Sequence, residues 1–374
     1  MEKTDRTHFD LAIVGGGVVG LWCAYFARQA GINVALFEAN KIASGPSGGL
    51  LGALMPHLPT RWYEKKQFQF QALIDLEKLC AQIEDESGID CGYRRVGRVL
   101  PLSHEQHVVA AVQQIEAAEF RWGSVNPEYD MRLEKQPTHE NWPHESVMPN
   151  GATVDNFSAR ISPRGLTSAL HKVIASQVSI FEDTKVEMTA DKKLTLPDGS
   201  TITADNIIVT AGFGTFDLLK HFAPGISGRA VKGQAAILDT DLDPNLPVVH
   251  KAGVYLIVHN DGRTAVGSTS EKEFEDGQTT DHLLDEVIEQ ARAICPLVGD
   301  ASVVERWANL RMQVSGRDPI VGPVPEHENI HVCTGGFKIS FGIAHRMAQA
   351  ALAPILGTDP IDIPPTFQIK NRVN

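Results

Sequence analysis

Residues 9 to 38 read FDLAIVGGGVVGLWCAYFARQAGINVALFE, and the rest of the chain is organised around this stretch. An apolar run rich in β-branched residues leads into three glycines, Gly15, Gly17 and Gly20, which have the spacing G-x-G-x-x-G. A helical stretch follows the glycines, and a second apolar run then ends on the acidic Glu38. A strand, a glycine turn, a helix and a second strand in this order predict a βαβ unit that binds a dinucleotide.

Each part of this motif has a physical role. Gly15 permits a tight turn, Gly17 lets backbone N–H groups approach a pyrophosphate, and Gly20 lets the helix lie close to the sheet. The diphosphate would then face the positive end of the helix dipole. Glu38, 18 residues after Gly20, is placed to accept hydrogen bonds from ribose hydroxyls. The alternative is a glycine-rich turn without a ligand, and the motif alone does not separate FAD from NAD.

The composition is that of a globular protein and disfavours a nucleic-acid partner. With 374 residues the chain is long enough for two domains, because single cores stop growing near roughly 250 to 300 residues. It is 43% hydrophobic and 21% charged, and 34 basic against 46 acidic residues give a net charge of −12. A chain with this charge repels phosphate backbones and anionic membranes.

The lack of a signal-peptide pattern and the cysteine usage favour the cytoplasm. The sequence passes from MEKTDRTH into the first predicted strand without the pattern of a signal peptide. Its apolar stretches are all shorter than the roughly 18 residues of a transmembrane helix. The five cysteines are an odd number without a C-x-x-C pair, which favours a reducing compartment and argues against a zinc site. We therefore expect a cytoplasmic enzyme without a metal.

A second glycine-rich segment, residues 41 to 59, reads KIASGPSGGLLGALMPHLP. Its small residues supply free N–H groups and hydroxyls, which suit a loop that wraps a diphosphate and reaches toward a flavin ring. The alternative is a flexible surface linker, but linkers seldom contain an apolar run such as that from Leu50 to Met55.

Further along, apolar spacing predicts regular elements separated by irregular ones. We expect a helix over 63–89, a strand over 91–101, a helix over 104–120, an irregular segment over 121–151, a polar segment over 152–165 and a helix over 166–175. Strands are expected over 178–182, 185–189 and 207–210, with a hairpin turn at 197–199. The last strand ends in Ala211-Gly212, and a strand that returns from a hairpin into a small-residue turn favours FAD over NAD.

The second half of the sequence predicts another sheet. Residues 229 to 270 contain strands with a hairpin turn at 260–262, and they precede a helix over 283–294 and a strand over 330–333. We predict the α/β class: an FAD-binding, Rossmann-like two-dinucleotide fold with an inserted antiparallel-sheet substrate domain of the α+β type. The FAD-binding domain would contain 1–90, 152–228 and 305–374, and the substrate-binding domain would contain 91–151 and 229–304.

Seven motifs in this order resemble the D-amino-acid oxidase superfamily, nearest its glycine oxidase and sarcosine oxidase-like branch. They are IVGGGVVG with Glu38, SGPSGGLLGAL, ADNIIVTAG, VKGQ, VYLIVHNDGRTAVGSTSE, WANLRMQVSGRDPIVGPV and TGGFKISFG, and they extend over most of the chain. The resemblance implies FAD bound in an extended form, a substrate sheet formed by insertions, and oxidation of an amine at carbon.

The resemblance also implies how the substrate is held. Arg311 matches the arginine that binds the substrate carboxylate in glycine oxidase-like enzymes, a task that suits the paired donors of a guanidinium. Tyr255 matches a tyrosine that shares this carboxylate, although the HN that follows in VYLIVHN replaces the usual Pro-Arg or Pro-Lys. A structural ion pair for Arg311 and an ordinary sheet aromatic for Tyr255 are the alternatives.

Lys338 lies in the last motif, after a pair of glycines that allow close approach of the backbone to a flavin. The helix that begins near Ser340 would aim its positive end at the flavin, and with Lys338 it would stabilise negative charge developing on the N1–C2=O region. Family members often carry Arg at position 338, and Lys lacks the bidentate fork, so a grip on a carboxylate is less favoured. The alternative is a solvated lysine.

The predicted site residues are as follows. For the cofactor they are Gly15, Gly17, Val18, Val19, Gly20, Glu38, Ala39, Ser44, Ser47, Gly48, Gly49, Leu51, Val186, Ala211, Gly212, Gly336, Phe337, Lys338, Ile339 and Ser340, and for catalysis they are Arg311, Tyr255 and Lys338. His57 and Cys333 lie where a covalent flavin link could form. Their local sequences differ from the family's attachment sites, so we expect a loop or core histidine and a buried strand cysteine.

We therefore predict an FAD-dependent amine or amino-acid oxidase or dehydrogenase. A small or N-substituted amino acid would pass a hydride from Cα to flavin N5, with oxygen or an unidentified carrier as the final electron acceptor. The resulting imine would hydrolyse to an oxo acid. The alternatives are an FAD-dependent 2-hydroxy acid dehydrogenase, the flavin domain of a tRNA-modifying enzyme, which the acidic charge opposes, and a flavoprotein subunit of a larger complex. A homo-oligomer is equally open.

Overall fold

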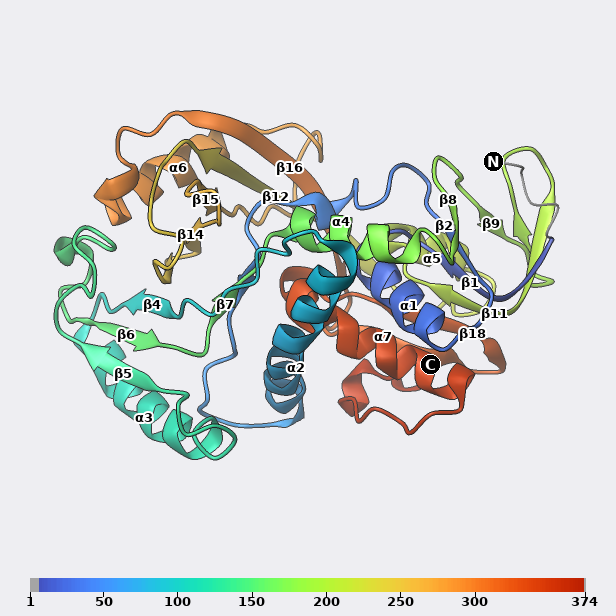
Figure 1. Cartoon of the computed structure of the whole chain (residues 1–374), viewed down its shortest axis with the longest axis horizontal. Helices are drawn as coiled ribbons and strands as arrows, with labels where there is room; N and C mark the ends of the chain where they lie inside the picture. Colours follow the sequence, from blue (N-terminus) through green and yellow to red (C-terminus); the bar gives the residue numbers. More distant parts are fainter. Residues whose placement is uncertain (1–6, 373–374) are drawn as a thin grey trace.

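The computed structural model describes residues 7–372, and within them two large sheets form the two halves of the molecule (Figure 1). The first sheet contains β1 (His8–Val14), β2 (Val34–Phe37), β8 (Ser179–Phe181), β9 (Glu187–Met188), β10 (Leu194–Thr195), β11 (Thr201–Val209), β17 (Ile320–Val324) and β18 (His327–Thr334). The second contains β4 (Arg98–Pro101), β5 (Met131–Glu134), β6 (Ala152–Asp155), β12 (Gly228–Leu238), β13 (Val248–Lys251), β14 (Val254–Val258), β15 (Thr264–Gly267) and β16 (Val303–Val314). A short pair consists of β3 (Ala53–Leu54) and β7 (Ala159–Arg160).

The first sheet has a parallel centre that gathers the strand ends at one edge. Its order is β17-β18-β11-β1-β2-β8, and β1 pairs in parallel with both β2 and β11. Val14, the last residue of β1, lies opposite Phe37 of β2 and Val209 of β11. The three strands therefore end together, and the residues that follow them meet at one place although they are far apart in sequence.

Helices surround both sheets. They are α1 (Val18–Gln29), α2 (Glu64–Ser87), α3 (Glu105–Arg121), α4 (Pro163–Ile174), α5 (Thr215–Leu218), α6 (His282–Ile294) and α7 (Ser340–Leu356). Leu11 and Ile13 of β1 pack into a core with α1, α2, α4 and α7, whereas Ala12 and Val14 pack into the core on the opposite face. Because both faces are covered, β1 and β2 are almost continuously apolar, as parallel strands in α/β proteins are.

The second sheet is almost wholly antiparallel. Its order is β16-β12-β15-β14-β13-β4-β6-β5, with one parallel pair between β13 and β4. The long strands β12 and β16 pair from Gly228 opposite Val314 to Leu238 opposite Val303. Helix α6 packs against β12, β14 and β15, and in Figure 1 the pair β12 and β16 extends toward the first half of the molecule.

Most sequence predictions of regular structure are confirmed. The helices α2, α3 and α6 match their predicted ranges within a few residues, and the two predicted hairpin turns join β10 to β11 and β14 to β15. Helix α4 begins at Pro163, three residues earlier than predicted, because the Ser162 side chain accepts a hydrogen bond from the Gly165 N–H and starts the helix there.

Some strand predictions are wrong. Within 91–101, β4 covers Arg98–Pro101, and the segments expected to be irregular or polar contain β5, β6 and β7. These short strands gain their hydrogen bonds from partners distant in sequence, which local patterns do not reveal. Strands β6 and β16 lie in the second sheet, although most of 152–228 and 305–374 belongs to the first half. The exact domain division stays a prediction. In residues 7–372, no helix combines the length and apolar character needed to cross a membrane.

Candidate active site

The glycine turn after β1 is packed against the end of β11. Gly15 has φ +117°, and a Cβ there would lie 2.7 Å from the carbonyl carbon and oxygen of Thr210. The Thr210 hydroxyl donates to the Gly15 carbonyl at 2.8 Å, which fixes the turn. A Cβ on Gly20 would lie 1.9 Å from the Gly15 carbonyl oxygen, so α1 approaches the turn as closely as a glycine allows.

Glu38 and Ser47 are held against the start of α1. The backbone N–H groups of Gly16 and Asn40 donate to the two carboxylate oxygens of Glu38 at 2.7 and 2.9 Å. Each carboxylate oxygen can accept further hydrogen bonds, so this arrangement leaves capacity for ribose hydroxyls. The Ser47 hydroxyl accepts from the Val18 N–H at 2.9 Å and thereby joins the serine- and glycine-rich segment to the helix start.

A cavity of about 1430 Å³ opens beside this turn and is lined by both sheets. This volume exceeds the roughly 300 to 1,000 Å³ of a pocket for one small ligand, so it can hold a dinucleotide together with a substrate. The N-terminal ends of α1 and α7 both border it, and neither helix has an acidic residue in its first turn. Two positive helix ends therefore face one cavity, which suits an anionic group.

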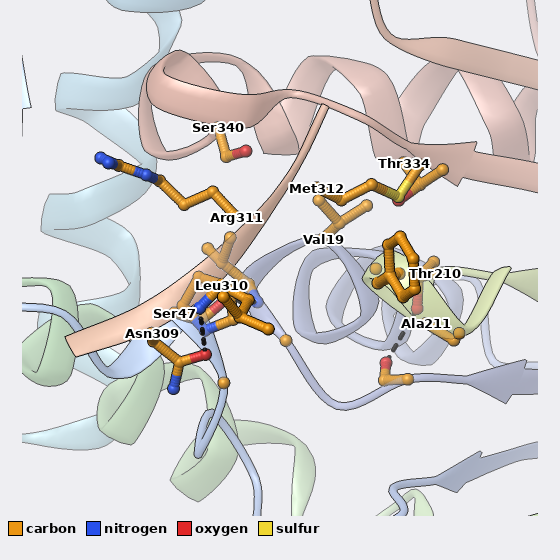
Figure 2. A pocket seen from close by; sticks show the side chains of 18 of the residues that line it. Val19, Ser47, Thr210, Ala211, Asn309, Leu310, Arg311, Met312, Thr334 and Ser340 are labelled. Carbon is orange, nitrogen blue, oxygen red and sulfur yellow. Dashed lines mark hydrogen bonds between the residues drawn. The ribbon is translucent and has the colours of Figure 1, made fainter. Parts of the chain in front are cut away.

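Figure 2 shows side chains that line this cavity, with Thr210 and Ala211 on one side of the view and Asn309, Leu310 and Arg311 on the other. Asn309, Leu310, Arg311 and Met312 enter it from β16, which belongs to the second sheet. The Arg311 side chain points away from Thr210 and Ala211. The glycine turn, next to Thr210 and Ala211, and the Arg311 guanidinium thus lie at different parts of the cavity.

Arg311 is fixed in place by groups of the second sheet. Its Nη2 donates to the Thr269 carbonyl at 2.6 Å and its Nη1 to the Ser268 hydroxyl at 3.3 Å, while its buried Nε has no protein partner within residues 7–372. The guanidinium lies over Gly233 of β12, where a Cβ would come within 2.1 Å of Nη2. Burial lowers the pKa of Arg311, but a guanidinium stays charged in proteins. Each Nη atom carries a second hydrogen, so this fixed cation can still bind a carboxylate.

Tyr255 borders the same cavity from β14. It lies opposite His250 of β13, and the two rings stack with centroids 4.3 Å apart and planes inclined by 26°. Burial raises the pKa of Tyr255, so its phenol stays protonated and can donate a hydrogen bond. Burial, with the charges of Arg98 and Lys338, lowers the pKa of His250 to about 4 and keeps its ring neutral.

Lys338 lies in the short turn of 3-10 helix over 337–339 that leads into α7. Its side chain is exposed at the cavity, yet partial desolvation and the nearby charge of Arg311 lower its pKa. Within residues 7–372 its amine has no ion pair or hydrogen bond with the protein. Phe337 lies under the Arg311 guanidinium, whose carbon is 5.8 Å from the ring centroid.

The structure brings together nearly all of the predicted site residues. Every predicted cofactor or catalytic residue borders the cavity except Gly20 and Gly48. Gly20 acts instead through the close approach of α1 to the turn, and a Cβ on Gly48 would lie 2.6 Å from the Ala43 carbonyl oxygen. The binding and catalytic roles of the whole set stay predictions.

Sequence reasoning missed residues that support this set. Thr210 fixes the turn, Gly233 leaves room for Arg311, and Ser268 and Thr269 hold its guanidinium. Thr210 and Gly233 occur in the motifs ADNIIVTAG and VKGQ, so the sequence marked both positions but did not indicate what either residue does. Trp307 also borders the cavity and would contact a Cβ on Gly49 at 3.4 Å.

The two residues considered for a covalent flavin link lie outside the cavity lining. His57 is exposed, and its backbone N–H donates to Gln69 Oε1 at 2.7 Å. Cys333 is fully buried in β18, as expected for a strand cysteine. The five cysteines are free and buried. Within residues 7–372, no cluster of three or more His, Cys, Asp or Glu residues could hold a metal ion.

Comparison with known proteins identifies the family. The family described as DAO, FAD dependent oxidoreductase, matches residues 10–350. The chain belongs to this family and is an FAD-dependent oxidoreductase. The glycine turn, the Glu38 carboxylate and the two helix ends at one large cavity fit this cofactor.

Individual relatives agree with this assignment. The chain is 26% identical to the glycine oxidase of Pseudomonas putida over 373 residues, covering 97% of this chain and 99% of the relative. It is 22% identical to the glycine oxidase of Bacillus licheniformis over 361 residues, covering 94% of both. Its fold is similar to the crystal structure of glycine oxidase from Geobacillus kaustophilus, with a TM-score of 0.86, 20% identity, and coverage of 98% of this chain and 100% of that chain.

Proposed function

We propose that this FAD-dependent oxidoreductase oxidises the C–N bond of a small amino acid or N-substituted amino acid. The product would be an imine that hydrolyses to an oxo acid and to ammonia or a primary amine. The observation that carries the proposal is that Arg311 and Tyr255 border the same cavity as the glycine turn after β1. The glycine oxidases among the relatives support the same substrate class. When bound, FAD supplies the acceptor for the hydride that leaves the substrate carbon.

The first sheet provides the groups that would hold FAD. The positive end of α1 and the hydroxyl of Ser47, which is placed there by the Val18 N–H, would hold the diphosphate, and Glu38 would accept hydrogen bonds from the ribose. The start of α7, with Lys338 beside it, borders the cavity and would offer positive charge to the end of the cofactor that gains electrons. Glu38 and Ser47 are fixed by hydrogen bonds to the backbone before any ligand arrives, which reduces the cost of binding.

The second sheet would hold the substrate. The Arg311 guanidinium is oriented by Ser268 and Thr269, so it can bind a carboxylate without reorganising. The protonated phenol of Tyr255 can donate to the same carboxylate. Two contacts at one end of the substrate fix the direction of its Cα–H bond.

The charges at this end of the cavity favour a neutral substrate amine. Acidic residues that border the cavity are Glu38, Glu187 and Asp217, which belong to elements of the first half. Arg311 and Lys338 are cations, and like charges lower the pKa of a substrate ammonium group. The amine would lose its proton to solvent on binding, and no side chain needs to act as a base.

Anaerobic spectral titration of the purified holoprotein tests this proposal. Glycine, sarcosine and the two alanine enantiomers should bleach the flavin absorbance if the proposal is right, and glycolate and lactate should not. Bleaching by the hydroxy acids alone, or by none of these compounds, would contradict it. Admission of air after bleaching shows whether oxygen accepts the electrons.

A variant pair tests the role of Arg311. Arg311→Met should raise the dissociation constant for amino acids by about 100-fold or more, because a charge-assisted bidentate contact contributes about 3 kcal/mol. Arg306→Met is the matched control, since Arg306 lies on the same strand but pairs with Asp285 at 2.8 Å, outside the cavity lining. Equal effects of the two substitutions would contradict a specific role for Arg311.

A further inference from the structure

Arg311 reaches across β12 to the segment that follows β15. Its side chain starts on β16, and its guanidinium lies over Gly233 of β12. Beyond this glycine it donates to the Thr269 carbonyl at 2.6 Å and to the Ser268 hydroxyl at 3.3 Å. Within residues 7–372 the guanidinium forms no ion pair. The group proposed to bind the substrate carboxylate is therefore charged, buried and not neutralised by the protein.

A carboxylate of the protein is nevertheless close to this guanidinium. Thr269 contacts both groups, because its hydroxyl donates to Glu271 Oε1 while its carbonyl accepts from Arg311. Burial lowers the pKa of Arg311, and the charge of Glu271 opposes this shift. The Glu271 side chain is only 10% exposed, so water screens its charge little. A buried carboxylate and a buried guanidinium this close would attract each other strongly.

Lys232 of β12 holds the Glu271 carboxylate in another place. Its Nζ lies 3.6 Å from Glu271 Oε2 and donates to Asp281 Oδ2 at 2.6 Å. Gln234 Nε2 donates to Glu271 Oε1 at 2.9 Å and to Asp281 Oδ1 at 2.8 Å. Burial opposes the charge of Lys232, but the carboxylates of Asp281 and Glu271 raise its pKa. Lys232 therefore stays charged and competes with Arg311 for Glu271.

The backbone fixes this arrangement. The Lys232 N–H donates to the Glu271 carbonyl at 2.9 Å, and the Glu271 N–H donates to the Lys232 carbonyl at 3.0 Å. The Gln234 N–H donates to the Thr269 hydroxyl at 2.9 Å. Without the Lys232 ammonium group, the buried Glu271 would lack its cation, and the Arg311 guanidinium on the other side of Thr269 would be the partner within reach.

We propose that Lys232 is a positioning residue that holds Glu271 away from Arg311, so that the guanidinium stays free for the substrate carboxylate. The inference rests on the function proposed above, in which Arg311 binds that carboxylate. Each Nη atom of Arg311 has a second hydrogen, and Glu271 and a substrate would compete for these donors. Lys232 decides this competition in favour of the substrate.

Binding of an unreactive analogue tests the role of Lys232 without turnover. (Methylthio)acetate has a thioether in place of the amine of sarcosine. It is titrated into the oxidised holoprotein, and the perturbation of the flavin spectrum gives the dissociation constant. Lys232→Met should raise this constant at least about tenfold, which corresponds to about 1.4 kcal/mol, because the analogue must then displace Glu271 from Arg311. An unchanged constant would overturn the proposal.

Removal of the competing carboxylate should restore binding. The double variant Lys232→Met with Glu271→Gln should bind (methylthio)acetate within about threefold of the unmodified protein. This variant removes a cation and an anion together, so it keeps the test decisive if Lys232→Met alone does not retain FAD. Glu271→Gln alone should bind the analogue equally or more tightly. Weak binding by the double variant, or by Glu271→Gln alone, would show that these residues act in another way and would refute the inference.

A neutral ligand and a second lysine separate competition from general damage. In 2-(methylthio)acetamide an amide replaces the carboxylate, so Lys232→Met should change its dissociation constant by less than about threefold. Lys251→Met is the matched control, because Lys251 is a half-buried lysine of β13 whose Nζ donates to the Ser103 hydroxyl at 2.9 Å and to the Val147 carbonyl. It should leave both constants unchanged. Equal losses for the two ligands, or for the two lysine variants, would rule out the proposed role.

Arg311→Met separates failure of this inference from failure of the proposed function. If Arg311→Met weakens binding of (methylthio)acetate and Lys232→Met does not, the inference falls and the proposed role of Arg311 stands. If Arg311→Met leaves binding unchanged, the proposed carboxylate site itself is contradicted. With sarcosine, Lys232→Met should raise the concentration needed for half-maximal anaerobic bleaching, while the limiting rate of bleaching changes by less than about threefold. A fall in the limiting rate alone would count against competition for Arg311.

Discussion

Gly233 is expected to control substrate affinity although it does not border the cavity. A Cβ at this position would lie 2.1 Å from Nη2 and 2.4 Å from Cζ of Arg311. Gly233→Ala therefore forces the guanidinium to move by roughly 1 Å or more before it regains ordinary van der Waals contact. The move displaces Arg311 from the Thr269 carbonyl at 2.6 Å and the Ser268 hydroxyl at 3.3 Å, which orient it.

The expected loss follows from these contacts. Two hydrogen bonds at about 0.5 to 1.5 kcal/mol each would be weakened, and a misplacement of about 1 Å can cost 100-fold in a reaction that depends on orientation. We expect the dissociation constant of (methylthio)acetate to rise about 10- to 100-fold, or about 1.4 to 2.8 kcal/mol. Because the clash involves the end of a flexible side chain, and alanine suits a strand better than glycine, Tm and flavin content should change little.

A double-mutant cycle provides the control. The same Gly233→Ala substitution is placed in the Arg311→Met background, where the guanidinium that the new methyl group displaces is missing. Titration of the oxidised flavin spectrum with (methylthio)acetate should then give no further loss of affinity. Unchanged affinity in the single variant, or an equal loss in both backgrounds, would refute the reasoning.

Three further outcomes are expected. Gly20→Ala places a methyl group 1.9 Å from the Gly15 carbonyl oxygen, and this backbone atom cannot move aside. The substitution should lower the stability of the fold by about 1 to 3 kcal/mol, measured through Tm, and reduce the flavin content, measured by absorbance. Normal values for both would contradict this. Glu38→Gln removes one acceptor from the carboxylate that receives the Gly16 N–H at 2.7 Å, so flavin should dissociate about tenfold more readily in a dialysis assay, and equal retention would count against ribose binding. Burial lowers the pKa of His331 from 6.5 to about 4, so the unfolded chain binds the proton more readily than the folded chain, and stability falls as the pH drops from 6.5 toward 4. His331→Val should therefore show a smaller fall in the urea midpoint of unfolding between pH 7.5 and pH 5. An identical fall in the variant would argue against this origin.

Local sequence was enough to predict those elements whose conformation is set by residues a few positions apart. The strand, glycine turn and helix over 9–30 are found as predicted, because Gly15 has φ +117° and both it and Gly20 contact backbone that excludes a Cβ. The hairpin turns at 197–199 and 260–262 were predictable for a similar reason, since Asp-Gly sequences adopt the required backbone conformation without help from distant residues.

The short strands of the second sheet could not be predicted in this way. Strand β6 pairs with β4 on one side and β5 on the other, and these partners come from separate parts of the chain. A strand of four residues has too few alternating positions to show a period. It exists because its neighbours complete its hydrogen bonds, which is a property of the sheet.

The sequence by itself determined the dinucleotide motif, the fold class and the identity of Arg311, Tyr255 and Lys338 as candidates. Tertiary structure decided how these three side chains are arranged. The pairing of β12 with β16 sets Gly233 beneath Arg311, and the pairing of β13 with β14 stacks His250 on Tyr255. Lys338 joins them because α7 begins at the edge where β1, β2 and β11 end. The charge balance of the cavity depends on these long-range pairings, and local patterns carry no information about side chains that meet only through a shared sheet.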